Sequence, residues 1–303
     1  MSIQAKTEPA NSKRLAFRSA WFLAPLFVAV GLFVAYVESN QVSSREGAEP
    51  AAAAPVIGLS DSAGGQAIDS LDEAIAFARS RRARLSQVAN YTAVFSKTEL
   101  VDRRLISQTM DLKFRQAPFS VYLRVHSKRQ PAREVIFVEG RNDDRMIVHD
   151  AGIKAFLTLN LKPDNPRVLT ENRYPITEIG MAKMLDTALA IWEREKDIAP
   201  ENVDVRLSSG QKIGSNACEE LRITHQEPLS GLRFHITRVA FDIETGFPLL
   251  LEQYDWPTQP EEAPPLVERY LYSDVNTAFG VTDADFDPQN SEYNFGWAST
   301  SSL

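Results

Sequence analysis

Four histidines are the first side chains in this 303-residue chain that could do chemistry, since imidazole serves as a general base and as a metal ligand. None of them stands in an H-E-x-x-H motif or at a comparable metal-ligand spacing. Three fall within segments predicted to be strands and one lies at a strand end, which favours ordinary sheet residues. These histidines are His126, His149, His225 and His235.

Nucleophiles are equally sparse. Cys218 is the single cysteine, which excludes an intramolecular disulfide and every multi-cysteine metal site. It heads a predicted strand, and we interpret it as a small buried apolar group. No G-x-S-x-G motif and no glycine-rich phosphate loop occurs in the sequence. Because no nucleophile, base or metal set converges, an enzyme is the least favoured class, and we predict neither catalytic residues nor a cofactor.

One acidic run imitates a metal site. Asp283, Asp285 and Asp287 resemble the opening of a calcium-binding loop. The sixth position of that loop is Pro288, where glycine is needed, and the twelfth is Asn294, where glutamate is needed. The sequence therefore predicts a solvated acidic loop and no metal site.

The overall composition is that of a globular protein. Hydrophobic residues make up 44% and charged residues 24%, which excludes a collagen-like or wholly disordered chain. With 33 Lys+Arg against 40 Asp+Glu, the net charge is −7, so the chain lacks the basic excess typical of nucleic-acid binding. A chain of this length can build a stable core without disulfides.

The N-terminal part predicts a membrane anchor. Ser19–Val37 contains 19 uncharged residues, SAWFLAPLFVAVGLFVAYV. At about 1.5 Å per residue, such a helix nearly matches a hydrocarbon core about 30 Å thick. Basic residues dominate the preceding tail, 1–18, which predicts a cytoplasmic N-terminus. We therefore expect one transmembrane helix at 19–37, an inner (cytoplasmic) membrane location and a C-terminal body in the periplasm.

A cleaved signal peptide is the alternative for this segment. Ala52–Ala54 would offer a processing site. The apolar region of a signal peptide usually runs about 7–15 residues, and this one is longer. That length favours a retained signal anchor.

The remaining boundaries follow from composition. Residues 38–67 are rich in Ala, Gly, Ser and Pro and contain no aromatic residue, which predicts a flexible linker. The folded body is predicted to span 68–287. Residues 288–303 are predicted to form a polar, loosely held tail.

Periodicity predicts the architecture of the body. A first helix begins at Ser70, which forms a capping box with Glu73. The apolar period then changes to two, and Gly140–Asp144 and Glu244–Gly246 have the chemistry of hairpin turns. A second amphipathic helix is expected over Thr177–Lys196. The order of elements predicts an α+β fold, with one curved antiparallel sheet and two helices on its concave face. The expected strands are Ile106–Phe114, Phe119–Val125, Glu134–Val138, Arg145–His149, Lys154–Leu159, Val203–Leu207, Ala217–His225, Leu232–Ile243, Phe247–Trp256 and Leu266–Ser273.

Several runs resemble known exported bacterial proteins. YPITEIGM at Tyr174–Met181 and PFSVYL at Pro118–Leu123 are similar to DUF1571, an exported bacterial domain of unknown function. LKFRQAPFSVYLRV at Leu112–Val125 resembles the opening strand pair of lipoprotein carriers of the LolA/LolB type. REVIFVEGRNDDRMIVHD at Arg133–Asp150 resembles the hairpin that follows in those carriers.

The resemblance to the carriers implies an unclosed β-barrel whose apolar cavity is lidded by helices and receives the acyl chains of a lipoprotein. In the carriers an arginine on an early strand helps to hold the lid closed. Arg115 is the matching position here, although Pro118 follows it by three residues instead of directly. Those carriers are usually soluble, whereas this chain is predicted to be tethered, which favours work at the inner-membrane surface.

The apolar faces of the early strands and of the second helix are the predicted acyl-chain site. An ordinary core against the helices would use the same side chains, so the sequence leaves both possibilities open. The candidates for the cavity are Phe95, Ile106, Met110, Leu112, Phe114, Phe119, Val121, Leu123, Met184 and Leu185.

These expectations combine into two functional hypotheses. The first is a membrane-tethered periplasmic protein that binds a lipid or lipoprotein ligand through its acyl chain, without catalysis and without nucleic acid. The second is a protein-interaction or sensor module of the cell envelope, in which the half-barrel is a scaffold for a protein partner.

Overall fold

A computed structural model describes residues 68–128, 131–151, 157–198, 200–259 and 261–295. All of them belong to one compact unit, Ser62–Leu303. The predicted basic tail, membrane span and linker, 1–67, lie outside the described residues. Within the described ranges, no helix is both long enough and apolar enough to cross a membrane.

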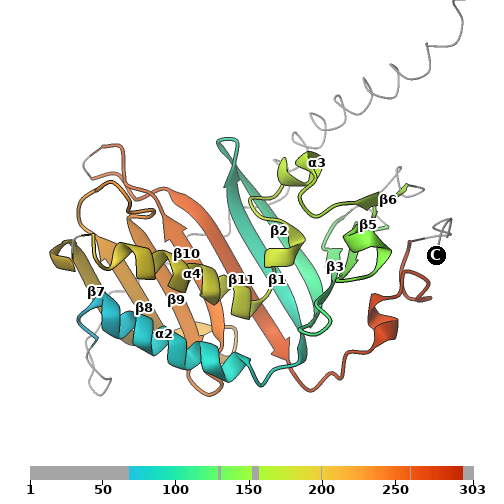
Figure 1. The fold of residues 1–303 in the computed structure, drawn as a ribbon, viewed down its shortest axis with the longest axis horizontal. Helices are drawn as coiled ribbons and strands as arrows, with labels where there is room; N and C mark the ends of the chain where they lie inside the picture. The colour runs from blue at the N-terminus through green and yellow to red at the C-terminus, as the bar shows by residue number, and fades with distance from the viewer. Residues whose placement is uncertain (1–67, 129–130, 152–156, 199, 260, 296–303) are drawn as a thin grey trace, which may run out of the picture. The chain divides into compact units, whose positions relative to one another are not determined.

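The core of the unit is an open antiparallel sheet of eleven strands in the order β6-β5-β4-β3-β2-β1-β11-β10-β9-β8-β7 (Figure 1). The predicted α+β class and unclosed sheet are confirmed. The strands are β1 (Asn90–Val101), β2 (Arg104–Arg115), β3 (Ser120–Val125), β4 (Glu134–Val138), β5 (Met146–His149), β6 (Thr158–Leu161), β7 (Val203–Ile213), β8 (Asn216–His225), β9 (Ile236–Asp242), β10 (Pro248–Tyr254) and β11 (Leu266–Asn276).

The sheet consists of two meanders joined at one seam. Strands β1 to β6 pair in chain order, as do β7 to β11. Only the antiparallel pairing of β1 with β11 connects the two sets in the described sheet. Along this seam Phe95 lies opposite Tyr272, and Glu99 lies opposite Glu268.

Strand β1 is the element that periodicity missed. Its side chains alternate strictly between buried and half-buried positions along all twelve residues. The buried set begins with Tyr91, Ala93 and Phe95 but continues with Lys97 and Glu99. Because two of the buried positions are charged, the sequence shows no apolar alternation over the second half of the strand.

Two long helices lie on one face of the sheet, here called the helix face (Figure 1). They are α2 (Leu71–Leu85) and α4 (Met181–Glu195). The side chain of Ser70 accepts a hydrogen bond from the Glu73 amide, as a helix N-cap does. An ion pair of 2.7 Å between Arg82 Nε and Asp186 Oδ1 links the two helices.

The start of α4 depends on a glycine. Gly180 has φ +127°, and a Cβ there would lie 2.8 Å from the ring of Phe114. Only glycine therefore fits where the chain turns from the 3-10 turn η3 (Ile176–Glu178) into α4. The predicted second helix is confirmed, but it begins at Met181 and not at Thr177. The preceding loop contains a short helix, α3 (Pro166–Leu169), and η4 (Pro200–Asn202) follows α4.

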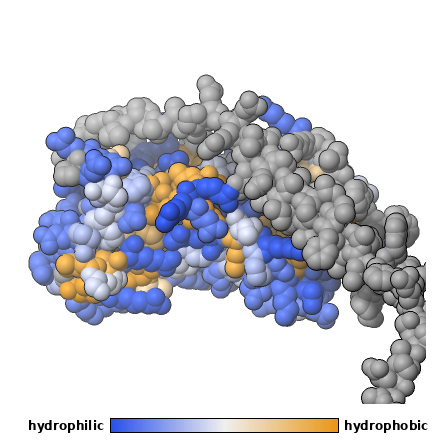
Figure 2. Space-filling model, turned by 90° about the horizontal axis from the view of Figure 1, so that it is seen from above, coloured by the Kyte–Doolittle hydropathy of each residue, from blue (hydrophilic) through white to orange (hydrophobic). Residues whose placement is uncertain are grey.

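Strands β3 and β4 are buried on both sides. On the helix face, Val121 and Phe137 belong to the main apolar cluster. On the opposite face, here called the outer face, Tyr122 and Ile136 form a second cluster with Phe295 and its neighbours. Seen from above the view of Figure 1, the described surface is mainly hydrophilic, with hydrophobic side chains gathered in the centre and at the lower left (Figure 2).

The second cluster is closed by residues 277–295, here called the C-terminal segment. It includes the 3-10 turn η5 (Asp283–Phe286) and packs against β3 and β4. The ring of Tyr293 stacks on Tyr122 with centroids 4.1 Å apart. The Asn294 amide donates to Glu134 Oε2 over 2.7 Å, and Thr158 donates to the Phe295 carbonyl over 2.7 Å.

The packed body therefore extends to Phe295 and does not end at 287, as the composition had suggested. The run from Gln289 to Phe295 is polar on average, but Phe295 is buried against the sheet and Tyr293 is half-buried with its ring stacked on Tyr122. The average composition of the segment does not show that two aromatic side chains attach it to the sheet. The last part of the predicted tail, 296–303, lies outside the described residues.

Phe295→Ala should lower the free energy of unfolding by about 3–5 kcal/mol, the usual cost of deleting a buried phenylalanine ring. The ring is only 1% exposed in this structure. Urea denaturation measures the change. Ser291→Ala, at an exposed position of the same segment, should stay within about 0.5 kcal/mol of wild type. Equal midpoints for the two variants would show that the segment does not contribute to the core.

Candidate functional site

The predicted cavity residues meet on the helix face. Eight of the ten are buried members of the main apolar cluster. Phe119 is partly buried and packs against that cluster, whereas Ile106 is half-buried on β2 opposite Glu99. The eight buried members are Phe95, Met110, Leu112, Phe114, Val121, Leu123, Met184 and Leu185.

Aromatic rings form a continuous row across this face. Phe114 stacks on Tyr91 with centroids 4.8 Å apart and meets Phe119 edge-on at 5.6 Å. Phe119 in turn lies 6.0 Å from Phe137 on β4. Across the seam, Phe95 stacks on Tyr272 at 4.8 Å. The row gives the helix face a broad apolar floor that spans both meanders.

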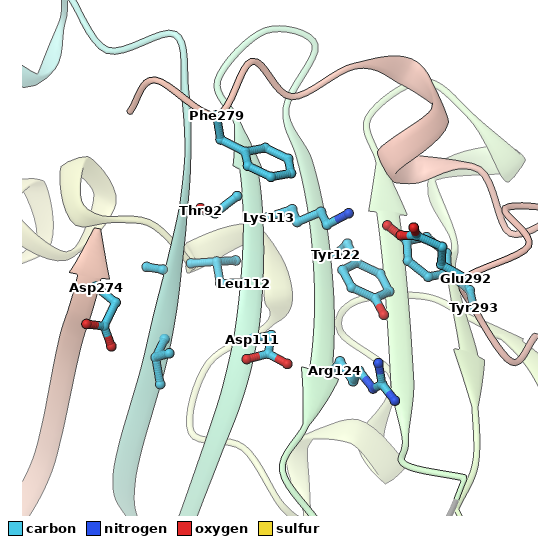
Figure 3. Close-up of a pocket in the computed structure, with 12 residues that line it drawn as sticks. Thr92, Asp111, Leu112, Lys113, Tyr122, Arg124, Asp274, Phe279, Glu292 and Tyr293 are labelled. Atoms are coloured by element: carbon cyan, nitrogen blue, oxygen red, sulfur yellow. The ribbon is translucent and has the colours of Figure 1, made fainter. Parts of the chain in front are cut away.

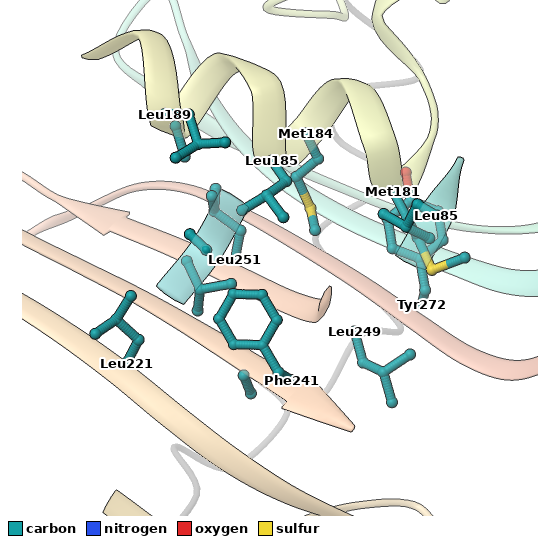
Figure 4. Close-up of a cluster of buried hydrophobic side chains, with 14 of the residues drawn as sticks. Leu85, Met181, Met184, Leu185, Leu189, Leu221, Phe241, Leu249, Leu251 and Tyr272 are labelled. Carbon is teal, nitrogen blue, oxygen red and sulfur yellow. The ribbon is translucent and has the colours of Figure 1, made fainter. Parts of the chain in front are cut away.

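Helix α4 covers part of this floor (Figure 4). Met184, Leu185 and Leu189 project from the helix toward the sheet, where Leu251 and Phe241 lie beneath them. The contact is made by apolar side chains throughout the middle of the helix. Hydrogen bonds from α4 to the sheet are found at the two ends of the helix.

Two buried tyrosines hold the N-terminal end of α4. The amide of Gly180 donates to the Tyr272 hydroxyl, and the amide of Met181 donates to the Tyr91 hydroxyl, each over 3.1 Å. These bonds satisfy amides that have no partner within the helix. Burial raises the pKa of both phenols, so they remain neutral acceptors. At the other end, Glu195 lies 3.2 Å from His225 Nε2.

Arg115, expected from the resemblance to hold the helical lid, lies on the opposite face. It donates to Asp283 Oδ1 over 2.7 Å and to Ser120 Oγ over 3.0 Å. Its guanidinium also lies 4.8 Å from the ring centroid of Phe286. Along β2, Met110, Leu112 and Phe114 face the helices, so the alternation of the strand places Arg115 outward. Its partners belong to the C-terminal segment and β3.

A buried polar cluster borders the apolar floor, near the β1–β2 turn. Lys97 Nζ donates to Glu99 Oε2 and to Asn172 Oδ1, each over 2.6 Å. Glu99 also accepts from the Tyr270 hydroxyl over 2.7 Å and from the Arg173 amide over 3.0 Å. Burial lowers the pKa of Lys97, and the neighbouring Glu99 opposes that shift.

A second carboxylate completes the polar cluster. Glu268 lies opposite Glu99 across the seam and forms an ion pair of 2.7 Å with Arg173 Nε. Burial raises the pKa of Glu268, although Arg173 acts in the other direction. The hydroxyl of Tyr174 donates to Glu268 over 3.3 Å and accepts from Arg233 over 3.0 Å. Arg233 thereby connects the segment before β9 with the segment before α4.

Sequence reasoning missed this cluster. Lys97 and Glu99 are two residues apart, so they lie on the same side of one strand. Charged residues on a solvated side of a strand have the same spacing, so the spacing alone does not predict a buried cluster. Their burial depends on β11 and on the loop that carries Asn172 and Arg173, which are distant in sequence. No pattern in the sequence around Lys97 and Glu99 indicates that β11 or this loop will pack against them.

The other candidates for chemistry have ordinary roles. His126 pairs with Asp111 at 2.7 Å, His149 lies 3.2 Å from the Thr158 hydroxyl, and His235 Nδ1 lies 2.7 Å from the carbonyl of His225. Cys218 is fully buried, as expected of a small apolar group. Among the described residues, no group of three His, Cys, Asp or Glu side chains is arranged to hold a metal ion.

The acidic run after β11 is bound by basic side chains of the sheet. Asp285 accepts from Lys113 over 2.6 Å, and Asp283 accepts from Arg115. The predicted solvated loop is thus a docked turn, although Asp283 itself remains largely exposed. Both carboxylates are paired with cations of the sheet, so their role is to hold this turn against the sheet.

These observations define an open antiparallel sheet domain with an apolar, helix-covered face bordered by buried charges. The chain matches the family model described as "Protein of unknown function (DUF1571)" over residues 88–295. It belongs to that family, as the sequence resemblance predicted. The match begins before β1 and ends at Phe295, so it includes the C-terminal segment. No curated protein matches the chain significantly.

Solved structures with a similar course of the chain include three that cover about 70% of it. MucB is 16% identical with a TM-score of 0.36 over 70% of this chain, which spans 62% of that structure. The lipoprotein LppX of Mycobacterium tuberculosis is 13% identical with a TM-score of 0.40, over 70% of this chain and 97% of that one. A LolA superfamily protein from Nitrosomonas europaea is 10% identical with a TM-score of 0.28, over 69% of this chain and 97% of that one.

The polar cluster yields a test of its energetics. Lys97→Met should cost about 3–5 kcal/mol of unfolding free energy, because it leaves Glu99 buried without its cation. The double variant Lys97→Met/Glu99→Leu should recover most of that loss, since no isolated charge remains. Urea denaturation of the two variants measures both quantities.

Arg206→Ala is the matched control, because Arg206 and Asp204 form an exposed ion pair of 2.9 Å. Its effect should stay below about 1 kcal/mol. If Lys97→Met were as mild as this control, the Lys97–Glu99 pair would not be a desolvated one.

Proposed function

We propose that this protein binds an acyl chain, free or attached to a protein, between α4 and the helix face, without covalent chemistry. One observation carries the proposal. All four methionines of the described residues belong to the main apolar cluster of the helix face, Met181 and Met184 on α4 itself, Met110 on β2 and Met146 on β5. Methionine is unbranched and has three rotatable bonds, so a surface rich in it can repack around ligands of different shape.

The attachment of α4 is compatible with displacement. Its middle meets the sheet through apolar contacts and is linked to α2 by the Arg82–Asp186 ion pair, and its hydrogen-bonded ties to the sheet are at Gly180, Met181 and Glu195. An acyl chain that enters beneath the helix replaces contacts of Met and Leu side chains by contacts of methylene groups. Because each buried methylene is worth about 0.8 kcal/mol, a chain of ordinary length can offset the lost packing.

The polar cluster gives the site a direction. The methionines and aromatic rings provide an apolar floor, whereas Lys97, Glu99 and Glu268 form a polar border on the same face. A ligand with one apolar end and one polar end matches this arrangement, with its chain over the floor and its head group toward Tyr174 and Arg233. An acyl chain on a lipid or on a lipidated protein has that character.

We further propose that the binding domain works at the surface of the bacterial inner membrane. The support is in the sequence: an uncharged run at 19–37 follows a basic tail, and residues 38–67 have a composition rich in Ala, Gly, Ser and Pro, which is typical of a linker. A flexible linker of that length spreads over about 30 Å. A tethered domain could accept a lipid from the outer leaflet without leaving the membrane surface.

Charge in the proposed site should abolish ligand binding. In residues 62–303, Met184→Glu and Met110→Glu should stay folded if ligand access brings water to these positions, and both should lose affinity for a fluorescent fatty-acid probe by at least about tenfold. Thermal unfolding and probe titration are read on the same samples. Met184→Leu and Met110→Leu conserve the apolar character and should keep both properties.

Leu105→Glu is the surface control, since Leu105 is 54% exposed on the β1–β2 hairpin. It should change neither the unfolding temperature nor probe affinity. A wild-type domain that binds no probe while both glutamate variants unfold would reject the acyl-binding site. That result would leave the interaction module as the function of the fold.

Topology is tested separately. A periplasm-dependent reporter such as alkaline phosphatase, fused after Leu303, should be active in a bacterial host because the basic tail keeps the N-terminus inside. Neutralising Lys13, Arg14 and Arg18 together should reduce that activity by weakening the charge bias. Activity only from a cytoplasm-dependent reporter would contradict the proposed orientation.

A further inference from the structure

The C-terminal segment is docked on the outer face in the manner of a bound peptide. It contacts the sheet through ion pairs, single hydrogen bonds and the packing of its aromatic rings, and none of its described residues pairs with a strand. Strand β11 ends at Asn276, so the segment begins where sheet pairing stops. A segment held in this way can be exchanged without breaking the sheet.

The outer face offers two cations to this segment. Lys113 Nζ binds Asp285, and Arg115 binds Asp283. The hydrogen bond from Arg115 lowers the pKa of Asp283. Burial alone would raise the pKa of Asp285, but the hydrogen bonds from Lys113 and Thr282 and the charge of Lys113 together outweigh it, and the pKa is lowered. The surface therefore selects a segment whose carboxylates, two residues apart, are ionised.

Aromatic rings provide the second element of recognition. The ammonium of Lys113 lies 5.3 Å from the ring centroid of Tyr293, 5.6 Å from that of Phe279 and 5.7 Å from that of Tyr122. Two of these rings come from the C-terminal segment and one from the sheet. Arg115 lies over Phe286 in the same way. Lys113 and Arg115 thus each meet one carboxylate and at least one ring of the segment.

The C-terminal segment does not cover the outer face completely. A pocket of about 370 Å³ remains on the outer face, lined by Lys113, Tyr122 and Arg124 of the sheet and by Phe279 and Tyr293 of the segment (Figure 3). Phe279 is still 49% exposed. Among the described residues, Arg124 has only a long ion pair of 3.9 Å, with Glu134. A competing segment can therefore reach the surface here before the resident one is released.

We propose that the outer face of β2–β4 is a binding surface for an acidic, aromatic segment of a partner protein, with the chain's own C-terminal segment as the resident ligand. The partner presents two carboxylates two residues apart, followed by aromatic side chains, and displaces residues 277–295. This surface is opposite the helix face and does not depend on acyl binding. Because the resident segment is tethered, its effective concentration is high, and the partner competes best when it is confined to the same membrane.

The test uses the full chain and a fluorescent peptide of residues 277–295. Tyr293→Ala/Asp285→Ala weakens the resident segment, so this variant should bind the peptide at least tenfold more tightly than wild type does. Bound peptide should also raise its unfolding temperature, which keeps the test valid for a variant that is less stable. A peptide of the same composition in scrambled order should do neither.

Reversing the charges of the surface and of the peptide distinguishes specific recognition from non-specific binding. Lys113→Glu/Arg115→Glu, added to the weakened chain, should abolish binding of the natural peptide. A peptide with lysine at the positions of Asp283 and Asp285 should restore binding to that chain to within about tenfold. Absence of peptide binding to the weakened chain, or equal binding of the scrambled peptide, would overturn the proposal. If the wild-type chain forms a concentration-dependent dimer and the peptide dissociates it, the surface binds a second copy of this chain. That result would overturn the proposal of a separate partner protein.

Discussion

The pairing of β1 with β11 is the interaction on which the rest of the domain depends. It is the one contact that joins the two meanders of the described sheet into a single surface. Its strands come from opposite ends of the described body, so closing this contact costs more chain entropy than any hairpin does. The side chains across the seam offset that cost. Phe95 stacks on Tyr272, and Glu99 is bound by Tyr270.

The charges at the seam also determine its register. A slip of one residue would turn every side chain of β1 to the other face. Lys97 and Glu99 would then leave Asn172, Arg173 and Tyr270, whose hydrogen bonds satisfy them in the native register. A buried ion pair is weak evidence for stability, but it penalises the wrong arrangement strongly. The polar cluster thus stabilises one alignment of the sheet, and the same alignment produces a continuous apolar floor.

The two-sided burial of β3 and β4 explains how the two proposed binding surfaces can coexist. Strands β3 and β4 carry apolar side chains on both sides, so neither face can be left open to water. Helices and the loop before α4 cover one side, and the C-terminal segment covers the other. Each cover is attached by side-chain contacts and not by sheet pairing. Both proposals therefore require a change in the covering layer and none in the pairing of the strands.

Local patterns in the sequence were enough to determine the α+β class, the hairpin turns, the two long helices and the phase of β2 and β3. Met110, Leu112 and Phe114 could be assigned to one face because strand alternation depends only on neighbours in the chain. The strand order, the burial of Lys97 and Glu99, the outward position of Arg115 and the docking of Tyr293 and Phe295 were decided by tertiary structure alone. Each of these depends on a partner distant in sequence, and no local period records which distant surface a side chain will meet.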